Sequence, residues 1–492
     1  MTKNIILATD GYKLGHRDQY PKGTEVVYSN FTARSCGYYP EACDGYVVAG
    51  IQLFISKYLI DDFNSGFFAR SKSDVSEKYK NRINSFLGSD NIVGANHIEE
   101  LHDLGYLPIK IKALPEGTLC PIGVPCMTIV NTHDRFYWLT NYLETLISCT
   151  LWLPMTSATT ARLFKKSLLS HASRTSWSDN ERLNIPFLCH DFSMRGMAGM
   201  DAAVLSGMGH LFSFTGSETI PAIEAAEEYY SKDDNLIAAT IPATEHSVMC
   251  AGSKDSEFDT FRRLITETYP KGFVSIVSDT WDYWKVITEY LPALKSEIMA
   301  RDGRFVVRPD SGDPVDIICG REFAGSDTPE GKGTYQLLWE IFGGTVNEAG
   351  YKVLDSHIGI IYGDSITLER QADIYSKLEA KGFAATNLVL GIGSYTYQGK
   401  TRDSLGFAVK STWCKINGVD TEIFKDPKTD NGVKKSLKGL ICVQQDDNKL
   451  IAVDQCSHTD EAKGALKTVF SNGVAHNTTS LTEIRNTVND SL

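Results

Sequence analysis

The chain has 492 residues and a formal net charge of −12, and 42% of its residues are hydrophobic. This length predicts two to four domains, or one large α/β body with additions. The acidic balance argues against nucleic acid as the main partner, and the apolar runs are far shorter than the ~18 residues that a membrane span requires. A small anionic substrate remains compatible, because charges more than about 8 Å apart are largely screened at physiological salt.

The cysteines and the N-terminus bear on the cellular compartment. The eleven cysteines are scattered and contain no CxxC pair, which argues against a disulfide framework and a zinc ribbon and favours a reducing compartment. The first residues lead directly into Asp10 and Lys13 without the apolar region that is typical of a signal peptide. We therefore expect a cytoplasmic protein without a membrane partner.

Residues 1–150 are predicted to form a mixed α/β segment. Residues 26–31 are typical of a strand, residues 47–59 of a buried helix, and the alternation over residues 108–114 of a half-exposed strand. From residue 135 to residue 153 the apolar spacing is helical.

Between about residues 184 and 400, short apolar runs alternate with helical patterns. The seven runs are residues 185–189, 211–214, 236–241, 273–277, 305–307, 358–362 and 388–390. Helical patterns lie between several of them, as over residues 258–268 and 368–378, the second followed by Gly382 as a helix end. Such alternation predicts a parallel sheet with right-handed crossovers. Seven units favour an irregular TIM-like α/β barrel over an open sheet, and we assign residues 151–404 to this catalytic domain.

Residues 405–492 are predicted to form a mostly β segment that packs with the N-terminal segment as an additional mixed domain. Residues 407–410, 413–416 and 440–443 are typical of antiparallel strands. The basic loop over residues 425–439 is either a solvated loop or a phosphate contact. The polar residues 473–492 are expected to fray.

Polar and charged residues follow every one of the seven runs. The stretch after residues 305–307 carries a cation, two prolines, a glycine and two carboxylates, which no strand interior accepts. The residues after the seven runs include His190, Asp191, Phe192 and Arg195; Gly216 and Glu218; Thr244, Glu245 and His246; Ser278 and Asp279; Arg308, Asp310 and Asp313; Gly363 and Asp364; Gly391, Gly393 and Ser394. Barrel enzymes keep their chemistry at this carboxyl-end rim of the strands.

The residue types at the rim indicate a sugar-phosphate or diphosphate ligand. Glycines let backbone N–H groups approach phosphate, and arginines bind its oxygens in pairs. Carboxylates suit Mg²⁺ or ribose hydroxyls. Phe192 is either a ring that stacks on a flat ligand or an ordinary core aromatic. His246 is a candidate base, nucleophile or phosphate contact, and a purely structural histidine is the alternative.

Other functions are less well supported by the sequence. The segment from Gly393 to Thr401 almost matches a P-loop, but it has five residues between its glycines where the P-loop has four. An aldolase-type lyase requires a Schiff-base lysine at a strand end, and none of the seven strand ends offers one. A non-catalytic dimeric binding protein that keeps the pocket stays open as an alternative.

The chain resembles the nicotinamide phosphoribosyltransferase family, of the type II phosphoribosyltransferases, over nearly its whole length. The resemblance rests on the order and spacing of residues 8–13, His190-Asp191-Phe192-Ser193-Met194-Arg195-Gly196, Pro242-Ala243-Thr244-Glu245-His246-Ser247, and residues 277–279, 308–314, 363–364, 401–403 and 424–427. It implies an α/β barrel with a mostly β domain, in a homodimer with shared active sites. The implied reaction transfers phosphoribosyl from 5-phosphoribosyl 1-pyrophosphate to nicotinamide, with Mg²⁺ and with ATP as a stimulating co-substrate. Nicotinate phosphoribosyltransferase, which has the same fold, is the alternative.

The resemblance also implies which residues bind nicotinamide. Phe192 and Tyr12, the latter from the partner subunit, sandwich the pyridine ring, and Glu218 faces the carboxamide. The resemblance implies that Arg308 contacts both the nicotinamide and the diphosphate. The family usually has aspartate at the position of Glu218, and either acid is expected to accept a hydrogen bond from an amide and to repel a carboxylate.

The remaining roles implied by the resemblance concern phosphate, sugar and metal. His246, Asp279 and Asp313 form the catalytic set, His246 being phosphorylated from ATP, and Asp279 and Asp313 lying near the sugar or Mg²⁺. Tyr395 stands where the family has glycine, and we expect it to narrow the space for phosphate. The diphosphate and phosphoribosyl contacts are Arg195, His246, Arg308, Asp310, Gly363, Asp364, Ser394, Arg402, Arg34 and Lys425.

Overall fold

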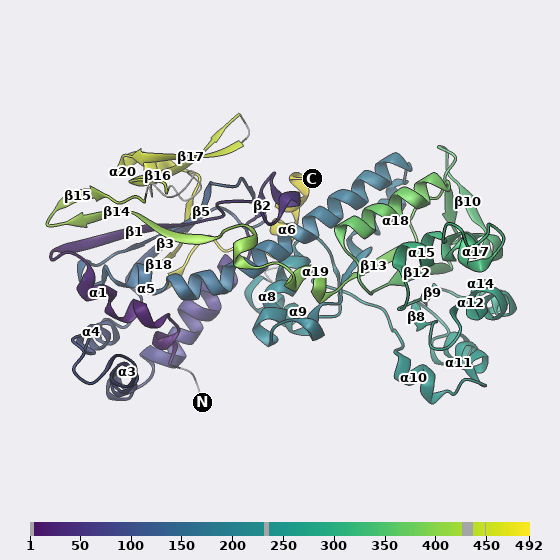
Figure 1. Ribbon diagram of the computed structural model, residues 1–492, viewed down its shortest axis with the longest axis horizontal. Coiled ribbons are helices and arrows are strands. Elements are labelled where there is room, and N and C mark those ends of the chain that lie inside the picture. The colour runs from purple at the N-terminus through teal and green to yellow at the C-terminus, as the bar shows by residue number, and fades with distance from the viewer. Residues whose placement is uncertain (1–3, 231–235, 426–435, 448) are drawn as a thin grey trace. The chain divides into compact units, whose positions relative to one another are not determined.

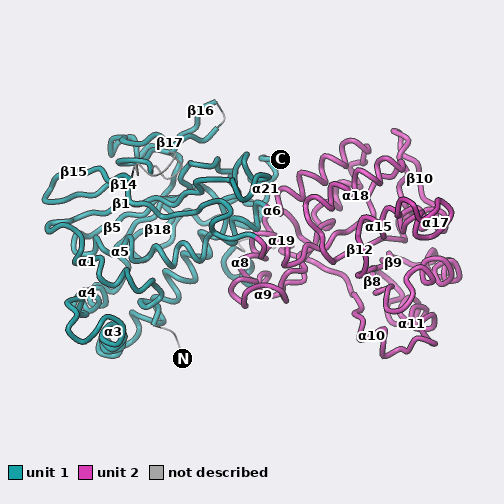
Figure 2. The backbone as a smooth tube through the Cα atoms, in the orientation of Figure 1, with its two compact units in different colours: residues 1–159, 224–235, 400–492 teal, residues 160–223, 236–399 magenta. Residues whose placement is uncertain are grey.

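The computed structural model describes residues 4–230, 236–425, 436–447 and 449–492. The chain divides into two compact units (Figure 2). Unit 1 comprises Met1–Thr159, Glu224–Asn235 and Lys400–Leu492, and unit 2 comprises Thr160–Ile223 and Leu236–Gly399. Each unit is therefore assembled from segments that are far apart in the sequence.

Unit 1 contains a seven-stranded antiparallel sheet in the order β15-β14-β1-β5-β3-β18-β19 (Figure 1). Strands at residues 26–31 and 108–114 are confirmed as β1 and β3. The two runs predicted from residue 407 to residue 416 form one strand, β14, because a register shift between Tyr28 and Ser29 of β1 accommodates the polar residues between them. The strands are β1 (Thr24–Thr32), β3 (Ile109–Ala113), β5 (Pro125–Asn131), β14 (Ala408–Ile416), β15 (Val419–Glu422), β18 (Lys467–Ser471) and β19 (Val474–Ala475).

Two small hairpin-like pairs and several helices complete unit 1. The pairs are β2 (Tyr46–Val47) with β4 (Leu119–Cys120), and β16 (Leu440–Asp446) with β17 (Lys449–Cys456). Lys434, Lys435, Asp426 and Pro427, which belong to the predicted basic loop and to one family motif, lie outside the described residues. The helices are α1 (His16–Gln19), α2 (Ile51–Leu53), α3 (Lys72–Leu87), α4 (Asn96–Leu104), α5 (Leu139–Tyr142), α20 (His458–Lys463) and α21 (Leu481–Asp490), and α6 (Glu144–Arg174) and α9 (Ile220–Tyr230) belong partly to each unit.

The prediction that the C-terminal residues fray is wrong. They form α21, which begins with a capping box in which Ser480 and Glu483 satisfy each other's backbone N–H groups. Leu481, Ile484 and Val488 are buried, and their spacing places them on one helix face. This apolar stripe anchors a segment whose polar composition alone suggested disorder.

A buried carboxylate supports the start of the second helix. Residues 47–59 are not one helix, since α2 begins at Ile51 after the strand β2 and continues as a π-helix over Phe54–Asp62. Glu116 is buried and accepts hydrogen bonds from the backbone N–H groups of Ile51 and Gln52. Burial raises the pKa of Glu116 to about 7, and hydrogen bonds from Tyr230 and from the backbone oppose this shift.

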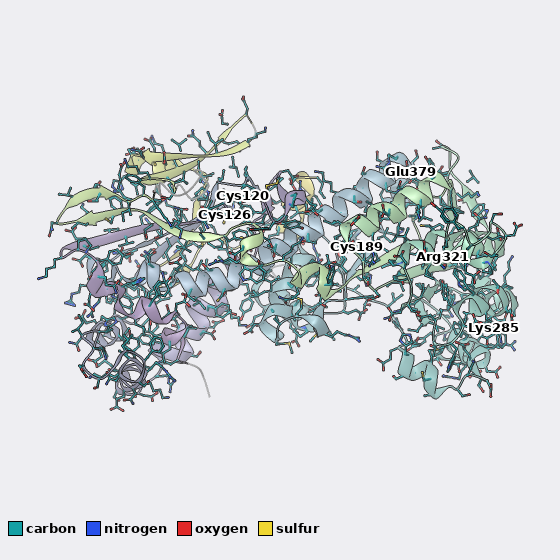
Figure 3. The ribbon with its side chains drawn as sticks, in the orientation of Figure 1. Cys120, Cys126, Cys189, Lys285, Arg321 and Glu379 are labelled. Atoms are coloured by element: carbon teal, nitrogen blue, oxygen red, sulfur yellow. A yellow bond between two sulfur atoms is a disulfide. The ribbon has the colours of Figure 1, made fainter. Side chains whose placement is uncertain are left out.

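The cysteines differ in part from expectation. Cys36 and Cys43 form a disulfide, with their Cα atoms 5.3 Å apart, whereas the scattered cysteine pattern led us to expect no such pairing. The nine other cysteines are free. Cys120, Cys126 and Cys189, labelled in Figure 3, are buried. Burial raises the pKa of the Cys126 thiol to about 12, so this group stays protonated and unreactive at neutral pH.

We expect reduction of the Cys36–Cys43 disulfide to destabilise unit 1. The bond joins residues that are seven positions apart, and closing a loop of this size stabilises a fold by about 2–3 kcal/mol through the unfolded chain. A dithiol reductant should therefore lower the melting temperature of the wild type. A C36S/C43S variant should melt at the lower temperature with or without reductant, and an unchanged wild-type melting temperature in reductant would contradict the prediction.

Unit 2 contains a six-stranded parallel sheet in the order β7-β6-β13-β12-β9-β8 (Figure 1). Its strands are β6 (Cys189–Asp191), β7 (Gly216–Ser217), β8 (Val274–Val277), β9 (Phe305–Arg308), β12 (Ile358–Tyr362) and β13 (Leu388–Ile392). The predicted strands at residues 273–277, 305–307, 358–362 and 388–390 are confirmed. Residues 211–214 instead end helix α8 and the turn after it, because a buried helix is as apolar as a buried strand.

The segment over residues 239–244 closes this sheet without forming a regular strand. The N–H of Ala239 donates to the carbonyl of Thr215 beside β7 (2.9 Å), and the N–H of Thr244 donates to the carbonyl of Ser275 in β8 (3.0 Å). Single parallel bridges join Ala239 to Gly216 and Ala243 to Ser275. Both edges of the curled sheet are thus bonded to one irregular segment, which gives the α/β barrel that the sequence predicts.

Helices of unit 2 follow and separate the strands. The helix predicted over residues 368–378 is confirmed as α18, and Gly382 follows it with a positive φ of 76°. Across the described residues, none of the helices combines the length and apolar character needed to cross a bilayer. The helices are α7 (Asp179–Arg182), α8 (Met200–Leu211), α10 (His246–Ala251), α11 (Glu257–Arg263), α12 (Tyr283–Lys285), α13 (Leu291–Ala293), α14 (Lys295–Met299), α15 (Pro314–Cys319), α16 (Pro329–Lys332), α17 (Thr334–Phe342), α18 (Leu368–Ala380) and α19 (Ser394–Gln398), with the hairpin β10 (Gly344–Val346) and β11 (Lys352–Leu354).

Candidate active site

Phe192 and Arg308 lie together at the carboxyl-end rim of the parallel sheet. The Phe192 ring packs on the backbone of β12 and β13, where a Cβ added at Gly363 would lie 2.7 Å and one at Gly391 2.3 Å from the ring. The Arg308 guanidinium carbon is 5.8 Å from the centre of the ring. Only glycine allows this approach at either position. The half-buried Phe192 ring is therefore held against the backbone and beside a cation, and we call this ring the aromatic platform.

Asp279 is the centre of a hydrogen-bonded cluster at the ends of β8 and β9. Its Oδ1 lies 3.2 Å from Nε2 of His246, the first residue of α10. Its Oδ2 accepts bonds from the backbone N–H of Asp310 (3.1 Å) and from the hydroxyl of Ser311. The Asp279 side chain is only 4% exposed, whereas that of His246 is 48% exposed. The contact with Asp279 therefore holds one edge of the His246 imidazole, and much of the rest of the ring is exposed to solvent.

Four rim carboxylates converge on the buried side of Tyr362. Burial raises the pKa of the Tyr362 phenol, and the charges of four aspartates raise it further; these are Asp364, Asp310, Asp279 and Asp313. The Tyr362 hydroxyl donates to the carbonyl of Gly312 (2.8 Å). The neighbouring negative charges make loss of the phenol proton unfavourable, so Tyr362 acts as a neutral hydrogen-bond donor beneath the rim.

Asp313 is a further carboxylate at this rim. Oδ1 of Asp313 accepts the backbone N–H of Val315 (2.9 Å) and of Asp316 (3.2 Å) as the cap of α15, and its Oδ2 lies 3.8 Å from Arg370. Within the described ranges, no three His, Cys, Asp or Glu side chains come close enough to enclose a metal ion. Mg²⁺ commonly binds one or two protein carboxylates and takes its other ligands from water and substrate phosphates.

Glu218 follows β7 beside Phe192. The register pairs Asp191 of β6 with Ser217 of β7, so Phe192 and Glu218 leave adjacent strands at the same level. The Glu218 N–H donates to the Asp191 carbonyl (3.0 Å), and the Glu218 carboxylate accepts a hydrogen bond from the Thr240 hydroxyl. The Glu218 carboxylate is exposed at the end of β7, the strand next to the one that Phe192 follows.

Arg195 and Ser394 are also brought together. A Cβ added at Gly196 would lie 1.9 Å from the Ser394 hydroxyl oxygen, so the turn that carries Arg195 is packed against the start of α19. Tyr395, the next residue, is 79% exposed. Arg195 is exposed as well, which leaves its guanidinium available to an anion.

The four other predicted contacts belong to unit 1. Tyr12 is 63% exposed, and the centres of the Tyr12 and His16 rings are 5.0 Å apart in an edge-on arrangement. Arg34 donates from Nε to the carbonyl of Gly406 (3.0 Å), and Arg402 pairs with its neighbour Asp403 (3.0 Å). The backbone N–H of Lys425 donates to the hydroxyl of Ser436 (2.8 Å).

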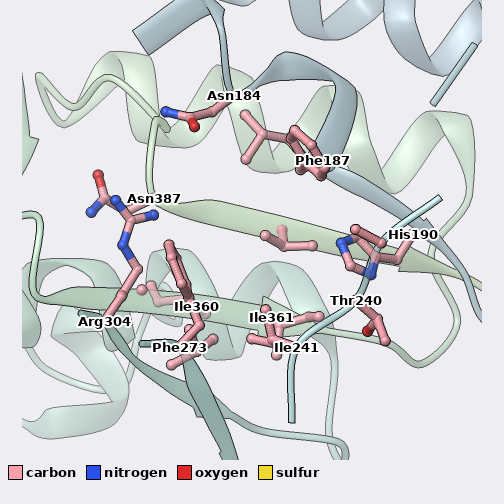
Figure 4. Close-up of a pocket in the computed structure, with 15 residues that line it drawn as sticks. Asn184, Phe187, His190, Thr240, Ile241, Phe273, Arg304, Ile360, Ile361 and Asn387 are labelled. Carbon is pink, nitrogen blue, oxygen red and sulfur yellow. The ribbon is translucent and has the colours of Figure 1, made fainter. Parts of the chain in front are cut away.

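A largely apolar cavity of 280 Å³ lies inside the parallel sheet (Figure 4). Its walls carry side chains from most of the strands and from the closing segment, among them Phe187, His190, Ile241 and Ile361. Burial lowers the pKa of His190 to about 4, so its imidazole is neutral at physiological pH. The cavity reaches His190 and Thr240, which lie side by side in the view of Figure 4.

The structure gives a role to two residues to which the sequence analysis assigns none. Asp191 is buried, and its carboxylate accepts bonds from the Ser193 N–H (2.9 Å) and the Thr219 hydroxyl (2.7 Å). Thr240 bonds to Glu218 but lies within an apolar run, where a threonine is unremarkable in a predicted strand. Asp191 was placed at the rim without a role, and an aspartate next to a buried strand was the available signal.

Comparisons with known proteins show the family of the chain. Residues 187–474 match the family model described as the nicotinate phosphoribosyltransferase (NAPRTase) family, and residues 4–111 match the nicotinamide phosphoribosyltransferase N-terminal domain. A nicotinamide phosphoribosyltransferase of Acinetobacter baylyi is 50% identical over 491 residues, which cover 98% of this chain and 96% of the relative. The chain belongs to the nicotinamide phosphoribosyltransferase family. A second nicotinamide phosphoribosyltransferase, from Mycoplasma pneumoniae, is 35% identical over 88% of this chain and 94% of its own.

Solved structures support the fold of this nicotinamide phosphoribosyltransferase family member. A nicotinate-nucleotide pyrophosphorylase from Pyrococcus furiosus matches 99% of this chain and 95% of its own with a TM-score of 0.55 at 14% identity. Human nicotinic acid phosphoribosyltransferase matches 98% of this chain and 93% of its own with a TM-score of 0.51 at 15% identity. At such identities the likeness concerns the fold alone.

Proposed function

We propose that this protein transfers phosphoribosyl from 5-phosphoribosyl 1-pyrophosphate to nicotinamide, forming nicotinamide mononucleotide and pyrophosphate. Family membership supports the reaction. The observation that carries the choice of substrate is the exposed Glu218 carboxylate at the end of β7, the strand next to the one that Phe192 follows. A carboxylate accepts a hydrogen bond from the carboxamide N–H of nicotinamide and repels the carboxylate of nicotinate, so the acid is the less favoured substrate.

The residues of the rim supply what this displacement needs. Reaction at the anomeric carbon passes through a cationic sugar, as in glycoside chemistry. Phe192 holds the pyridine ring so that its nitrogen faces the sugar, and Asp279 and Asp313 offset the positive charge that develops there. Arg308 and Arg195 bind the departing pyrophosphate, with Asp310 positioning the Arg308 guanidinium from 4.0 Å. No covalent nucleophile is required.

Magnesium is part of the proposal. Asp279 and Asp313 would hold Mg²⁺ together with phosphate oxygens of the substrate, and the ion neutralises charge on the leaving pyrophosphate. We assign Gly363, Asp364 and Ser394 to the ribose and 5′-phosphate, on the basis of their place at the rim. Arg34, Arg402 and Lys425 are assigned to the same phosphoribosyl group.

A cytoplasmic homodimer with shared active sites completes the proposal. In it the exposed ring of Tyr12 packs on the far face of the pyridine from a second copy of the chain. An aromatic side chain that is 63% exposed has apolar surface to cover. Removing the ring by Tyr12→Ala should therefore weaken nicotinamide binding.

His246 is proposed to accept a phosphoryl group from ATP. With Nε2 bonded to Asp279, the other ring nitrogen, Nδ1, is the one that attacks, and ADP leaves. We expect His246→Ala to keep a basal rate of mononucleotide formation and to lose its stimulation by ATP. The matched control is His458→Ala, which removes a similarly exposed histidine 3.4 Å from Asp420. Equal ATP stimulation in the His246 variant would remove the phosphohistidine from the scheme.

The proposed function is tested by a product assay. The purified protein is incubated with 5-phosphoribosyl 1-pyrophosphate, Mg²⁺ and ATP, with nicotinamide or nicotinate in parallel, and mononucleotides are detected by mass. Nicotinamide mononucleotide is the expected product, and Glu218→Ala should reduce the preference for the amide. Product from nicotinate alone would overturn the substrate assignment, and no product from either would favour a binding protein.

A further inference from the structure

We propose that Thr240 is a positioning residue that holds the Glu218 carboxylate in the orientation that selects the amide. This inference rests on the proposed function and adds to it a second residue in the choice of substrate. It starts from one contact, the hydrogen bond from the Thr240 hydroxyl to Oε1 of Glu218. An ionised carboxylate only accepts hydrogen bonds, so the hydroxyl must be the donor.

Both partners of this bond are anchored to the sheet. The Glu218 N–H is bonded to the carbonyl of Asp191 (3.0 Å), and the Asp191 carboxylate is fixed by Ser193 and Thr219. Thr240 directly follows Ala239, whose N–H bonds to Thr215 (2.9 Å). The bond therefore joins the end of β7 to the closing segment, and each partner lies at or next to a residue whose backbone is hydrogen-bonded to the sheet.

The side chain of Glu218 needs such an anchor. Glutamate has one more rotatable bond than aspartate, so an exposed Glu218 would sample several carboxylate positions. With Oε1 held by Thr240, the second oxygen, Oε2, remains to accept the carboxamide N–H. Across the part of the chain that the structure describes, no other group donates to this carboxylate. A single prepared acceptor favours the amide, whereas a mobile carboxylate can swing away from the carboxylate of nicotinate.

Thr240 also stands where a substrate ring would pass. It lines the cavity inside the sheet next to His190 (Figure 4), and His190 packs edge-on against Phe192 with the ring centres 6.0 Å apart. Thr240 therefore shares a cavity wall with the imidazole that packs against Phe192, on a segment that no regular strand pairing constrains.

The test compares variants that remove and restore the hydroxyl. Thr240→Val keeps the shape of the side chain and loses the donor, and Thr240→Ser keeps the donor. We expect the valine variant to raise the KM for nicotinamide about tenfold or more, with the KM for 5-phosphoribosyl 1-pyrophosphate changed less than about twofold. Its preference for nicotinamide over nicotinate should fall by a similar factor, and serine should restore both values.

The controls separate positioning from structure. Thr288→Val removes an exposed hydroxyl whose one hydrogen bond among the described residues is to the carbonyl of Trp284 (2.8 Å), and it should leave both constants unchanged. Equal values for Thr240→Val and wild type, or equal defects in the valine and serine variants, would overturn the proposal. Titration of nicotinamide into each variant measures the same affinity ratio without turnover, so absence of the proposed reaction is distinguished from absence of positioning by Thr240.

Discussion

Arg308→Ala is expected to lower kcat/KM by about 10²- to 10³-fold, the loss found when one charge-stabilising donor is removed from an active site. Arg308 is the charged residue closest to the Phe192 platform in the contacts described above, and its side chain is 20% exposed. Its Nη1 donates to the carbonyl of Thr244 (3.3 Å). The Arg308→Ala change therefore removes both the cation proposed to bind pyrophosphate and a hydrogen bond to the closing segment.

Steady-state kinetics with varied 5-phosphoribosyl 1-pyrophosphate measure this loss. Arg308→Lys should recover part of the rate, because lysine keeps the charge but not the planar pair of donors. Arg262→Ala is the matched control, since this arginine is 59% exposed and, among the described residues, its ion pair is with Glu297 (3.1 Å). A near-normal kcat/KM in Arg308→Ala would show that pyrophosphate is bound elsewhere.

Glu116→Gln is expected to abolish a pH-dependent loss of stability of about 3 kcal/mol. The pKa of Glu116 is about 7 in the folded protein and near its ordinary value of 4.5 in the unfolded chain. Between these values the folded protein holds a proton that the unfolded chain has released, so stability falls as pH rises through this window. The size follows from 1.36 kcal/mol per pKa unit.

Denaturant unfolding at about pH 5 and about pH 8 tests this expectation. The free energy of unfolding of the glutamine variant, relative to the wild type, should rise by about 3 kcal/mol between the two pH values. The exposed Glu100, which lies 3.7 Å from Arg135, provides the control variant Glu100→Gln. If the wild type and Glu116→Gln lose stability in parallel with rising pH, Glu116 is not the group responsible.

The barrel was predictable because its central strands are short, apolar and β-branched, as in β9, β12 and β13. Its edge was not. Residues 211–214 are as apolar as a strand but end helix α8, and β7 is the dipeptide Gly216–Ser217, which carries no strand signal. Residues 236–241 have the composition of a strand, yet beyond single bridges they form none in the described structure.

The candidate site follows the same division. Arg308 and Asp279 could be predicted because each lies at or just after a run that became a regular strand. The run before Phe192 is wrong as a strand over most of its length, since Ile185–Phe187 is a 3-10 helix and only Cys189 belongs to β6. The cap formed by Asp313 on α15 could be read from the proline after it, since Pro is favoured at the first position of a helix. The role of Thr240 could not, because a hydroxyl bond to Glu218 depends on the tertiary closure of the sheet and not on local sequence.

The irregular segment over residues 239–244 has a consequence for motion. It is held by single bridges, whereas β12 pairs with a neighbour on each side over several residues. Local opening costs the least free energy where backbone hydrogen bonds are few, so this segment opens more readily than the strands around it. Opening would release Thr240 from Glu218 and the Thr244 carbonyl from Arg308 in one event. A substrate that contacts Glu218 and Arg308 together would hold residues 239–244 in the closed position. Part of its binding free energy would then be spent on restricting the motion of the barrel.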